Sequence, residues 1–204
     1  MAIYPYDYFY NTHQRNSIDG KGGSVFSHIN VKDEGEDCDN AYWTGRNMAF
    51  CNGNILWTPT PRALDIVAHE YAHGVTGNTA GLEYSDESGA LNESFSDIFG
   101  VLVDRDDWTL FEELVKDFNY FPYGFVRSME NPELGNQPSH YEDFVVGGGV
   151  HTNSGIPNRA FYLIASEMGK EKAEQIYYRA LTTYLTRSSD FLDLRIGLEQ
   201  SAID

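Results

Sequence analysis

The sequence has no long apolar run, few basic residues and only two cysteines, and these shortages limit what the chain can be. No stretch reaches the roughly 18 uninterrupted apolar residues that a membrane span requires, so we expect no membrane partner. The N-terminal segment carries tyrosines and Asp7 in place of the basic start and apolar core of a signal peptide. We therefore expect a chain that works outside the membrane and carries no signal peptide.

Basic side chains are scarce relative to acidic ones. The chain has 14 Lys and Arg residues against 31 Asp and Glu residues, a formal net charge of -17 at pH 7. This surplus repels phosphate backbones and anionic membrane surfaces, so we expect no nucleic-acid partner. It suits cation binding, although we expect most of the carboxylates to form an ordinary solvated surface.

The two cysteines, Cys38 and Cys51, flank a short segment. One disulfide in an oxidising compartment and two reduced thiols are both open at this point. No repeat, low-complexity tract or linker rich in Pro, Gly or Ser divides the chain. With 204 residues and 41% hydrophobic content the chain can bury a core of its own, so we expect one compact unit.

The first sixty residues show one helical stripe and then strand signals. The segment "YPYDYFYNTHQR" has an aromatic stripe of helical character, and "GGSVFSHINV" has strand character. The run "NAYWTGRNMAF" places turn residues between two apolar arms, which predicts a β-hairpin over residues 40–50. We expect the acidic segment "KDEGEDCD" between them to be a loop.

From Pro61 onward the apolar period becomes helical. Apolar residues recur at three- and four-residue steps in two successive segments: Leu64, Val67, Ala68, Tyr71 and Val75, then Leu91, Phe95, Ile98, Phe99 and Leu102. Three more helices are predicted at about 153–168, at 170–185 after a stop at Gly169, and at 189–203 with Ser189 as the cap. The predicted fold class is α+β, mainly α.

The segment "HEYAH" places His69 and His73 four residues apart with Glu70 beside the first. On a helix, residues four apart project from one face, so the two imidazoles can share one cation. Glu70 lies beside that position, where a general base must sit to take a proton from an activated water. The plain alternative is an amphipathic helix that happens to carry two histidines.

A catalytic zinc site usually needs a third protein ligand, and Glu93 is the best candidate. It lies on the next predicted helix, with Asp97 one turn further along the same face, where a second carboxylate can orient a ligating histidine. The intervening segment is rich in turn-forming residues, so the two helices can fold back on each other. The spacing therefore favours a site of two histidines and one glutamate.

At this point the residues resemble a known family. The string "HEYAH", followed after 19 intervening residues by the glutamate of "NESFSD", is similar to the thermolysin family of zinc endopeptidases. Further matching segments occur in order over nearly the whole chain: "DNAYWTG", "DIVAHEYAHGVT", "GLEYSDESGALNESFSDIFG", "RSMENP", "GGVHTNSGIPNRAFYLI" and "YRALTTYLT". The resemblance implies a thermolysin-like helical catalytic lobe.

The resemblance implies a role for each matching site residue. His69, His73 and Glu93 correspond to the ligands of a catalytic Zn²⁺, with Glu70 as the general base and Asp97 behind a zinc histidine. Tyr84 and His151 correspond to the residues that donate hydrogen bonds to the developing oxyanion. The substrate backbone is bound by counterparts of Asn40, Ala41 and Arg127.

Structural calcium is also implied. The family's calcium ligands match acidic residues at the start of one predicted helix, at the end of the next and in the loop that follows: Asp65, Asp104, Asp107 and Glu112. Thr109 stands where an acidic residue is usual, so we expect one Ca²⁺ ion and no second. The matching apolar pocket, which implies cleavage before bulky hydrophobic residues, consists of Ile66, Leu110, Leu114 and Val126.

Compared with the family pattern, the chain is shorter at both ends. We expect residues 1–60 to be a residual N-terminal portion with the helix, hairpin and substrate edge strand, and residues 61–204 to be the helical zinc-binding lobe. Val146 stands where the family has an aspartate that orients the active-site histidine. We therefore expect His151 to be less well oriented, or to have a lower pKa, than its family counterparts.

The favoured function is a zinc-dependent endopeptidase acting on peptides or proteins, and by resemblance a secreted, extracellular one. The alternative is a catalytically silent, metal-binding fragment that serves as a binding module. The unmodified Glu70 and three ligands favour the enzyme, whereas the shortened N-terminal portion favours the fragment. A purely structural zinc site is disfavoured because no cysteine or fourth ligand closes it. The oligomeric state is left open.

Overall fold

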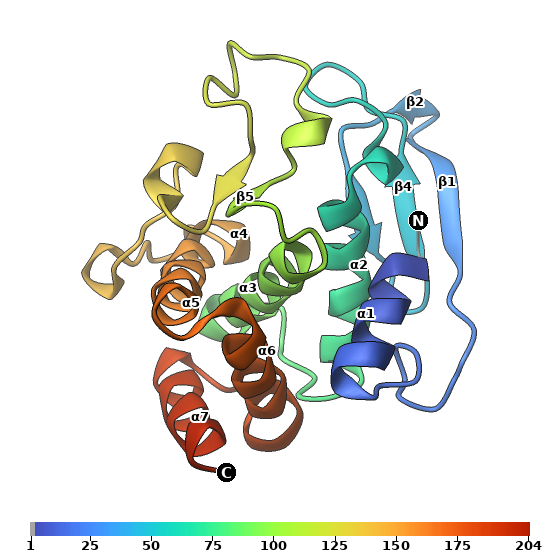
Figure 1. Ribbon diagram of the computed structural model, residues 1–204. Coiled ribbons are helices and arrows are strands. Elements are labelled where there is room, and N and C mark those ends of the chain that lie inside the picture. The colour runs from blue at the N-terminus through green and yellow to red at the C-terminus, as the bar shows by residue number, and fades with distance from the viewer. Residues whose placement is uncertain (1–2) are drawn as a thin grey trace.

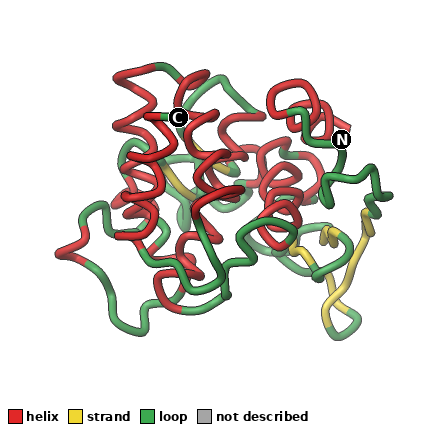
Figure 2. Tube along the Cα trace, turned by 90° about the horizontal axis from the view of Figure 1, so that it is seen from below, coloured by secondary structure: helices red, strands yellow, loops and turns green. Residues whose placement is uncertain are grey.

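The computed structural model of the protein describes residues 3–204, and helix is the predominant secondary structure in it (Figure 1). The longer strands lie together at one side of the helical body (Figure 2). The helices are α1 Ile3–His13, α2 Leu64–Gly77, α3 Asp86–Val103, α4 Val150–Asn153, α5 Gly155–Met168, α6 Lys170–Arg179 and α7 Phe191–Ile203. This arrangement confirms the predicted fold class, α+β with helix predominant.

Four strands form one small sheet in the order β2-β1-β4-β3. Their bounds are β1 Ser27–Asp33, β2 Glu36–Asp37, β3 Ala41–Trp43 and β4 Met48–Cys51. The predicted hairpin is present, because β3 and β4 pair antiparallel with Ala41 opposite Phe50. The β1 and β4 strands run parallel, and β3 lies at the edge of the sheet.

The acidic segment between β1 and β3 is not simply a loop, as the sequence had led us to expect. It turns back on itself, and β2 pairs antiparallel with β1, placing Lys32 opposite Asp37. The turn is formed by Glu34 and Gly35, both with positive φ, which reverses the chain within two residues. Lys32 and Asp37 also form a cross-strand ion pair at 3.6 Å.

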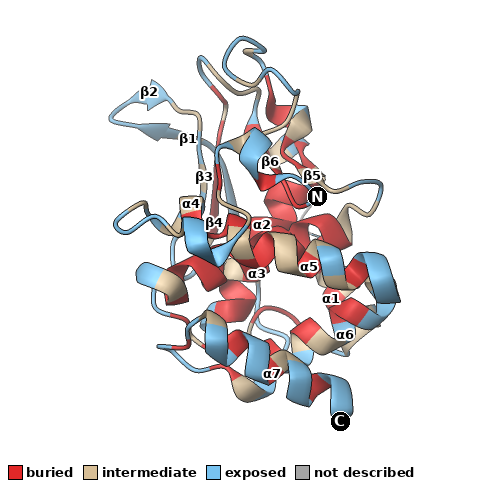
Figure 3. Ribbon diagram, turned by 90° about the vertical axis from the view of Figure 1, so that its left-hand side faces the viewer, coloured by how far each residue is buried: buried red, intermediate tan, exposed pale blue. Residues whose placement is uncertain are grey.

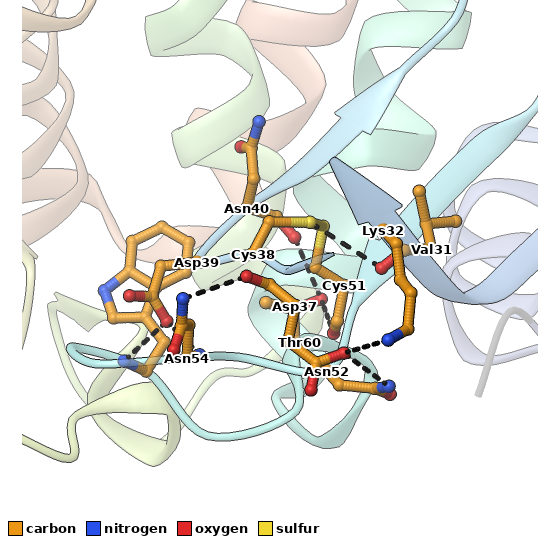
Figure 4. The surroundings of a disulfide bond; sticks show 11 residues. Val31, Lys32, Asp37, Cys38, Asp39, Asn40, Cys51, Asn52, Asn54 and Thr60 are labelled. Carbon is orange, nitrogen blue, oxygen red and sulfur yellow. Dashed lines mark hydrogen bonds and ion pairs between the residues drawn. A yellow bond between two sulfur atoms is a disulfide. The ribbon is translucent and has the colours of Figure 1, made fainter. Parts of the chain in front are cut away.

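Cys38 and Cys51 form a disulfide, which resolves the alternative left open by the sequence (Figure 4). Their Cα atoms lie 5.4 Å apart. The bond therefore ties the chain just before edge strand β3 to the end of β4.

The α2 and α3 helices form the centre of the molecule, where buried residues predominate (Figure 3). Of the apolar residues that predicted these helices, all are buried except Leu64, which is half-buried. The two helices pack against each other along their length, as the turn-rich segment between them allows. Side chains on the facing sides of α2 and α3 are thereby brought within contact distance deep in the protein.

The remaining helices pack around α2 and α3: α1 contacts both, α4, α5 and α7 contact α3, and α6 contacts α5 and α7. The predicted helix at 153–168 begins earlier, as a short α4 followed by α5, and the one at 170–185 consists of α6 and a π-helical turn, η5 (Ala180–Tyr184). Ser189 does not cap α7; Asp190 does, through a reciprocal capping box with Asp193. Ser189 instead accepts a hydrogen bond from the Thr186 backbone, because it lies one residue too far from the first helical turn.

Short elements connect α3 to α4. A two-stranded ribbon pairs β5 (Thr109–Leu110) with β6 (Arg127–Ser128), and the single turns in this region are η2 Glu112–Leu114, η3 Pro132–Gly135 and η4 Tyr141–Asp143. Another single turn, η1 Thr60–Arg62, directly precedes α2. Within residues 3–204, every helix is too short or too polar to cross a membrane.

Candidate metal centre and active site

His69 and His73 lie one turn apart on α2 and face Glu93 on α3. The two Nε2 atoms are 3.1 Å apart, and they lie 3.5 Å and 3.4 Å from the two carboxylate oxygens of Glu93. Among residues 3–204, these three form the one group of His, Cys, Asp and Glu side chains whose potential ligand atoms all lie within 4.8 Å of one another. The sequence-predicted ligand set is therefore brought together in space.

The other ring nitrogen of each histidine is occupied. His69 Nδ1 lies 2.9 Å from the Asp97 carboxylate, as expected from the sequence, and His73 Nδ1 hydrogen-bonds the side-chain oxygen of Asn92 at 2.8 Å. Sequence reasoning missed Asn92, although it directly precedes Glu93. These contacts fix both rings so that each Nε2 faces the cavity.

Arg127 connects the two buried carboxylates. Its Nη1 lies 2.8 Å and 2.9 Å from the oxygens of Asp97 and 3.5 Å from Glu93, while its guanidinium packs over the Phe111 ring. The β5–β6 ribbon holds it there, because Arg127 is paired with Leu110. Burial alone would raise the pKa of Asp97 and Glu93, but Arg127 and His69 hold the pKa of both carboxyls below the ordinary value.

The pKa values of the two histidines are shifted in opposite directions. Burial disfavours the charged form of His69, but the carboxylates of Asp97 and Glu93 outweigh it and raise its pKa to about 10. For His73, burial and the neighbouring charge of His69 lower the pKa to about 4. Within the pair, the positive charge is therefore favoured on His69 and disfavoured on His73.

Glu70 is buried on α2 beside the histidines and lines the same cavity. Its Oε2 atom is buried without a hydrogen-bond partner. Burial raises the pKa of Glu70 to about 7, an effect that the nearby charge of His69 only partly offsets. A buried carboxylate with a free oxygen and a pKa near neutrality can both accept and return a proton.

Tyr84 and His151 complete the cluster from outside the two long helices. The Tyr84 hydroxyl donates to Glu93 and lies 3.3 Å from His151 Nε2, which is itself 3.3 Å from Glu93. The side chain of His151 is 63% exposed, and burial of its remainder lowers its pKa. Gly89 permits this approach, because a Cβ there would overlap the Val150 side chain.

The cluster opens into a cavity of about 1160 Å³. Edge strand β3 forms one part of its wall, and Asn40 and Ala41, which the resemblance assigned to substrate binding, both line it. Residues 119–123 and Phe125 also line the cavity, as do Trp43 and Trp57. Sequence reasoning missed these aromatic residues, for which the density of aromatic side chains in "DFNYFPYGF" was the available signal.

The comparisons with known proteins agree with this geometry. The model of the thermolysin metallopeptidase catalytic domain matches residues 2–77, and the model of the thermolysin metallopeptidase alpha-helical domain matches residues 80–204. The chain belongs to the thermolysin family of metallopeptidases.

Relatives in this family are similar along almost the whole chain. An extracellular elastase of Staphylococcus epidermidis is 47% identical over 209 residues, covering 98% of this chain and 40% of the elastase. The neutral protease NprE of Bacillus pumilus is 45% identical over 208 residues, covering 98% of this chain and 67% of NprE. The solved precursor of protealysin from Serratia proteamaculans matches with a TM-score of 0.87 at 36% identity, covering 98% and 69% of the two chains.

The apolar pocket expected from the thermolysin-family resemblance lies only partly at the cavity. Ile66 and Val126 line it. Leu110 and Leu114 are fully buried and belong to the hydrophobic core behind the lining residues. They support the pocket wall instead of contacting its contents.

The four acidic residues expected to bind calcium in this thermolysin-family chain lie near the C-terminal end of α3. Asp65 accepts backbone hydrogen bonds from Ile66 and Phe111, and burial together with the nearby negative charge of Glu112 raises its pKa to about 7. Glu112 has a buried oxygen without a partner. Asp107 accepts from Thr109, and burial together with the neighbouring Asp106 carboxylate raises the pKa of Asp104.

Val146 stands where the family pattern has an aspartate, and its apolar side chain cannot hydrogen-bond the His151 ring. The side chain is 91% exposed, and the residue provides no charged group for His151. Beside it, Asn153 accepts from the Val145 amide and donates to the Val145 carbonyl, both at 3.0 Å, and the Gln137 side-chain amide donates to the His151 carbonyl at 2.5 Å. The backbone of His151 is therefore held, while its ring is free of a carboxylate other than Glu93.

Proposed function

We propose that this chain carries the active site of a zinc-dependent endopeptidase that hydrolyses peptide bonds on the N-terminal side of bulky hydrophobic residues. The observation that carries the proposal is the convergence of His69, His73 and Glu93 beside the partner-free carboxylate oxygen of Glu70. Because the chain spans 40% of the length of the elastase it resembles, the activity of a whole protein is inferred from this site.

The donor set fits zinc. With ligand bonds of 2.0–2.1 Å in a tetrahedral arrangement, ligand atoms should lie about 3.3 Å apart. The observed separations of 3.1, 3.4 and 3.5 Å surround this value. Three protein ligands leave one position open, as catalytic rather than structural zinc sites do.

In the proposed reaction, bound zinc supplies Lewis acidity that polarises the peptide carbonyl and lowers the pKa of water. Glu70 accepts the proton from the attacking water and delivers it to the leaving amine. Tyr84 and His151 donate hydrogen bonds to the carbonyl oxygen as negative charge develops there, each contributing roughly 3 kcal/mol. The carbonyl on the far side of the scissile bond is bound by Arg127, and edge strand β3 pairs with the substrate backbone through Asn40 and Ala41.

The test compares peptide hydrolysis by the wild type and the Glu70→Gln variant. We expect the variant to retain stoichiometric zinc and to lose activity by roughly 10²–10⁴-fold, because the ligands remain and only the base is removed. A zinc chelator should abolish wild-type hydrolysis, and added zinc should restore it. If the wild type is no faster than the variant while zinc is bound, the peptidase proposal fails and a metal-binding module is the better description.

We also propose that the acidic residues at the end of α3 bind one structural Ca²⁺. Support comes from the partner-free buried oxygen of Glu112 and from the raised pKa values of Asp65 and Asp104, which are caused first by burial and then by neighbouring carboxylates. A second ion is disfavoured, because Thr109 offers no carboxylate and the Lys170 ammonium already contacts the carbonyls of Arg105 and Asp107. The Cys38–Cys51 disulfide and the extracellular elastase relative support a proposed location outside the cell.

A further inference from the structure

The segment Phe118–Phe125, here called the aromatic loop, has an unusual composition for a surface segment. Five of its eight residues are aromatic: Phe118, Tyr120, Phe121, Tyr123 and Phe125. None is charged, although the whole chain has a net charge of -17. Phe118 and Tyr120 are each 64% exposed and Tyr123 is 57% exposed, so the core does not account for them.

The aromatic loop forms part of the cavity that holds the metal centre. Tyr120, Phe121, Tyr123 and Phe125 all line it, and the chain continues directly into Val126 and Arg127. Phe118 is equally exposed but does not line the cavity. The loop is the long segment at the top of Figure 1, between η2 and β6.

Backbone hydrogen bonds hold the loop in place. The Asp117 carbonyl accepts from the amides of Tyr120 and Phe121 at 3.2 Å and 3.0 Å, and its carboxylate accepts from Asn119. At the base of the loop, the amides of Lys116 and Asp117 both donate to the Leu56 carbonyl, at 2.9 Å and 3.3 Å. The aromatic wall is therefore present before any substrate binds.

We propose that the aromatic loop binds an apolar or aromatic side chain of the peptide substrate, downstream of the residue held by the pocket at Ile66 and Val126. This inference rests on the proposed peptidase function. A peptide paired with edge strand β3 would lie in the same cavity as the loop, because both line it. Its downstream side chains would then meet the loop that leads into Arg127, the residue proposed to hold the carbonyl on that side.

The chemistry of the wall determines which side chains it favours. An aromatic side chain of the substrate would bind here favourably, because it removes apolar surface from water and can make edge-to-face contacts with the Tyr and Phe rings of the loop. Tyr120 and Phe121 already make such a contact with each other, with ring centroids 4.8 Å apart. Acidic side chains would gain neither and would be repelled by the negative net charge. The loop therefore selects aromatic over acidic residues at one downstream position.

The experiment uses peptides that differ only in whether Phe, Ala or Asp occupies the second, third or fourth position after the scissile bond. We expect one of these positions to show roughly a 10-fold higher kcat/KM for Phe than for Ala, and a lower value for Asp. In a Tyr120→Ser/Tyr123→Ser variant this preference should fall to about 2-fold or less. A Tyr120→Phe/Tyr123→Phe variant should keep it, because the rings remain.

Phe118→Ser is the matched control, since it removes an equally exposed aromatic side chain of the same loop that does not line the cavity. Equal loss of preference in this control would overturn the proposal, as would a wild type without preference at any of the three positions.

Binding of the same peptides to Glu70→Gln, followed by the fluorescence of Trp43 and Trp57 in the cavity wall, separates the two proposals. The wild type could fail to hydrolyse any peptide while the Phe peptide still binds about 10-fold more tightly than the Ala peptide. If the Tyr120→Ser/Tyr123→Ser substitutions abolish that difference in affinity, the peptidase proposal fails and the loop proposal stands. Equal affinity for the Phe and Ala peptides overturns the loop proposal whatever the outcome for hydrolysis.

Discussion

At the scale of single residues, His13 is a titratable group placed where charge is unfavourable. Its ring stacks on Tyr178 with centroids 4.0 Å apart, and its Nε2 lies 3.2 Å from the Tyr8 hydroxyl, which donates to Glu174. The Nδ1 atom is buried without a partner. Burial lowers the pKa of His13 to about 4, so the folded protein keeps this ring neutral over most of the acidic range.

This placement predicts a loss of stability in mild acid. Below pH 6.5 an unfolded chain protonates His13 while the folded protein does not. The contribution of His13 to the free energy of unfolding therefore falls as the pH drops from 6.5 to 4. The free energy of unfolding should fall about 2 kcal/mol less between pH 7 and pH 5 in His13→Gln than in the wild type. Urea denaturation at both pH values measures this, with His28→Gln in exposed strand β1 as the control. Parallel slopes for the wild type and His13→Gln would contradict it.

Site residues differ in how far the sequence could locate them. The pair His69 and His73 could be placed from spacing alone, because residues four apart on one helix must share a face. The proximity of Glu93 required the packing of α2 on α3, which the turn-rich link allowed. Asn92 went unnoticed because the same period that makes Glu93 face α2 gives no sign that a neighbouring amide will reach His73.

At the scale of elements, Asp39 joins the two walls of the cavity. Its carboxylate accepts hydrogen bonds from four successive backbone amides at 2.5–3.0 Å, those of Asn54, Ile55, Leu56 and Trp57. The Leu56 carbonyl in turn receives the amides at the base of the aromatic loop. Edge strand β3 begins two residues after Asp39, so the strand and the aromatic loop are linked through one short segment, which the disulfide closes on its other side (Figure 4).

Removal of the disulfide should therefore weaken both stability and substrate binding. Cys38 and Cys51 are separated by 13 positions, and a loop of this size predicts a loss of about 3 kcal/mol in Cys38→Ser/Cys51→Ser. Because the bond anchors the start of β3, KM for peptides should rise more than kcat falls. Thermal unfolding and steady-state kinetics measure the two effects. The wild type with its disulfide reduced lacks the same bond and should behave like the variant. Unchanged KM in a folded variant would show that the disulfide does not hold the edge strand.

Helices and strands could be predicted where one of their faces is buried. They were harder to predict where a turn or a cap sets the bounds of the element. The apolar period located α2 and α3, and the pattern on both sides of "TGRN" located the β3–β4 hairpin. The β1–β2 turn was missed because its charged residues have no buried face to set a period. The cap of α7 was misplaced by one residue, since Ser189 and Asp190 are both good N-caps and only the capping box with Asp193 decides between them.

At the scale of the whole molecule, the net charge is -17, and the acidic residues near the end of α3 are only partly neutralised by basic side chains. Lys170 neutralises part of the acidic region at the end of α3, where its ammonium contacts the Asp107 carbonyl at 2.9 Å and packs over Trp108. Asp65, Asp104 and Glu112 remain without a cation among their described side-chain contacts, and each has a raised pKa. Bound calcium would relieve this repulsion where the central helix ends, so the ion should act on global stability and not on the metal centre directly.

Calcium should accordingly raise the melting temperature. At a free concentration 100 times its dissociation constant, one bound ion adds about 2.7 kcal/mol, which corresponds to roughly 5–11 °C for a chain of this size. Glu112→Gln removes a buried, partner-free oxygen and should abolish most of that shift. Asp106→Asn makes the same charge change at an exposed residue of the same acidic run and should keep it. Sodium chloride at matched ionic strength controls for screening, and an equal response of both variants would mean that calcium acts only by screening the surface charge.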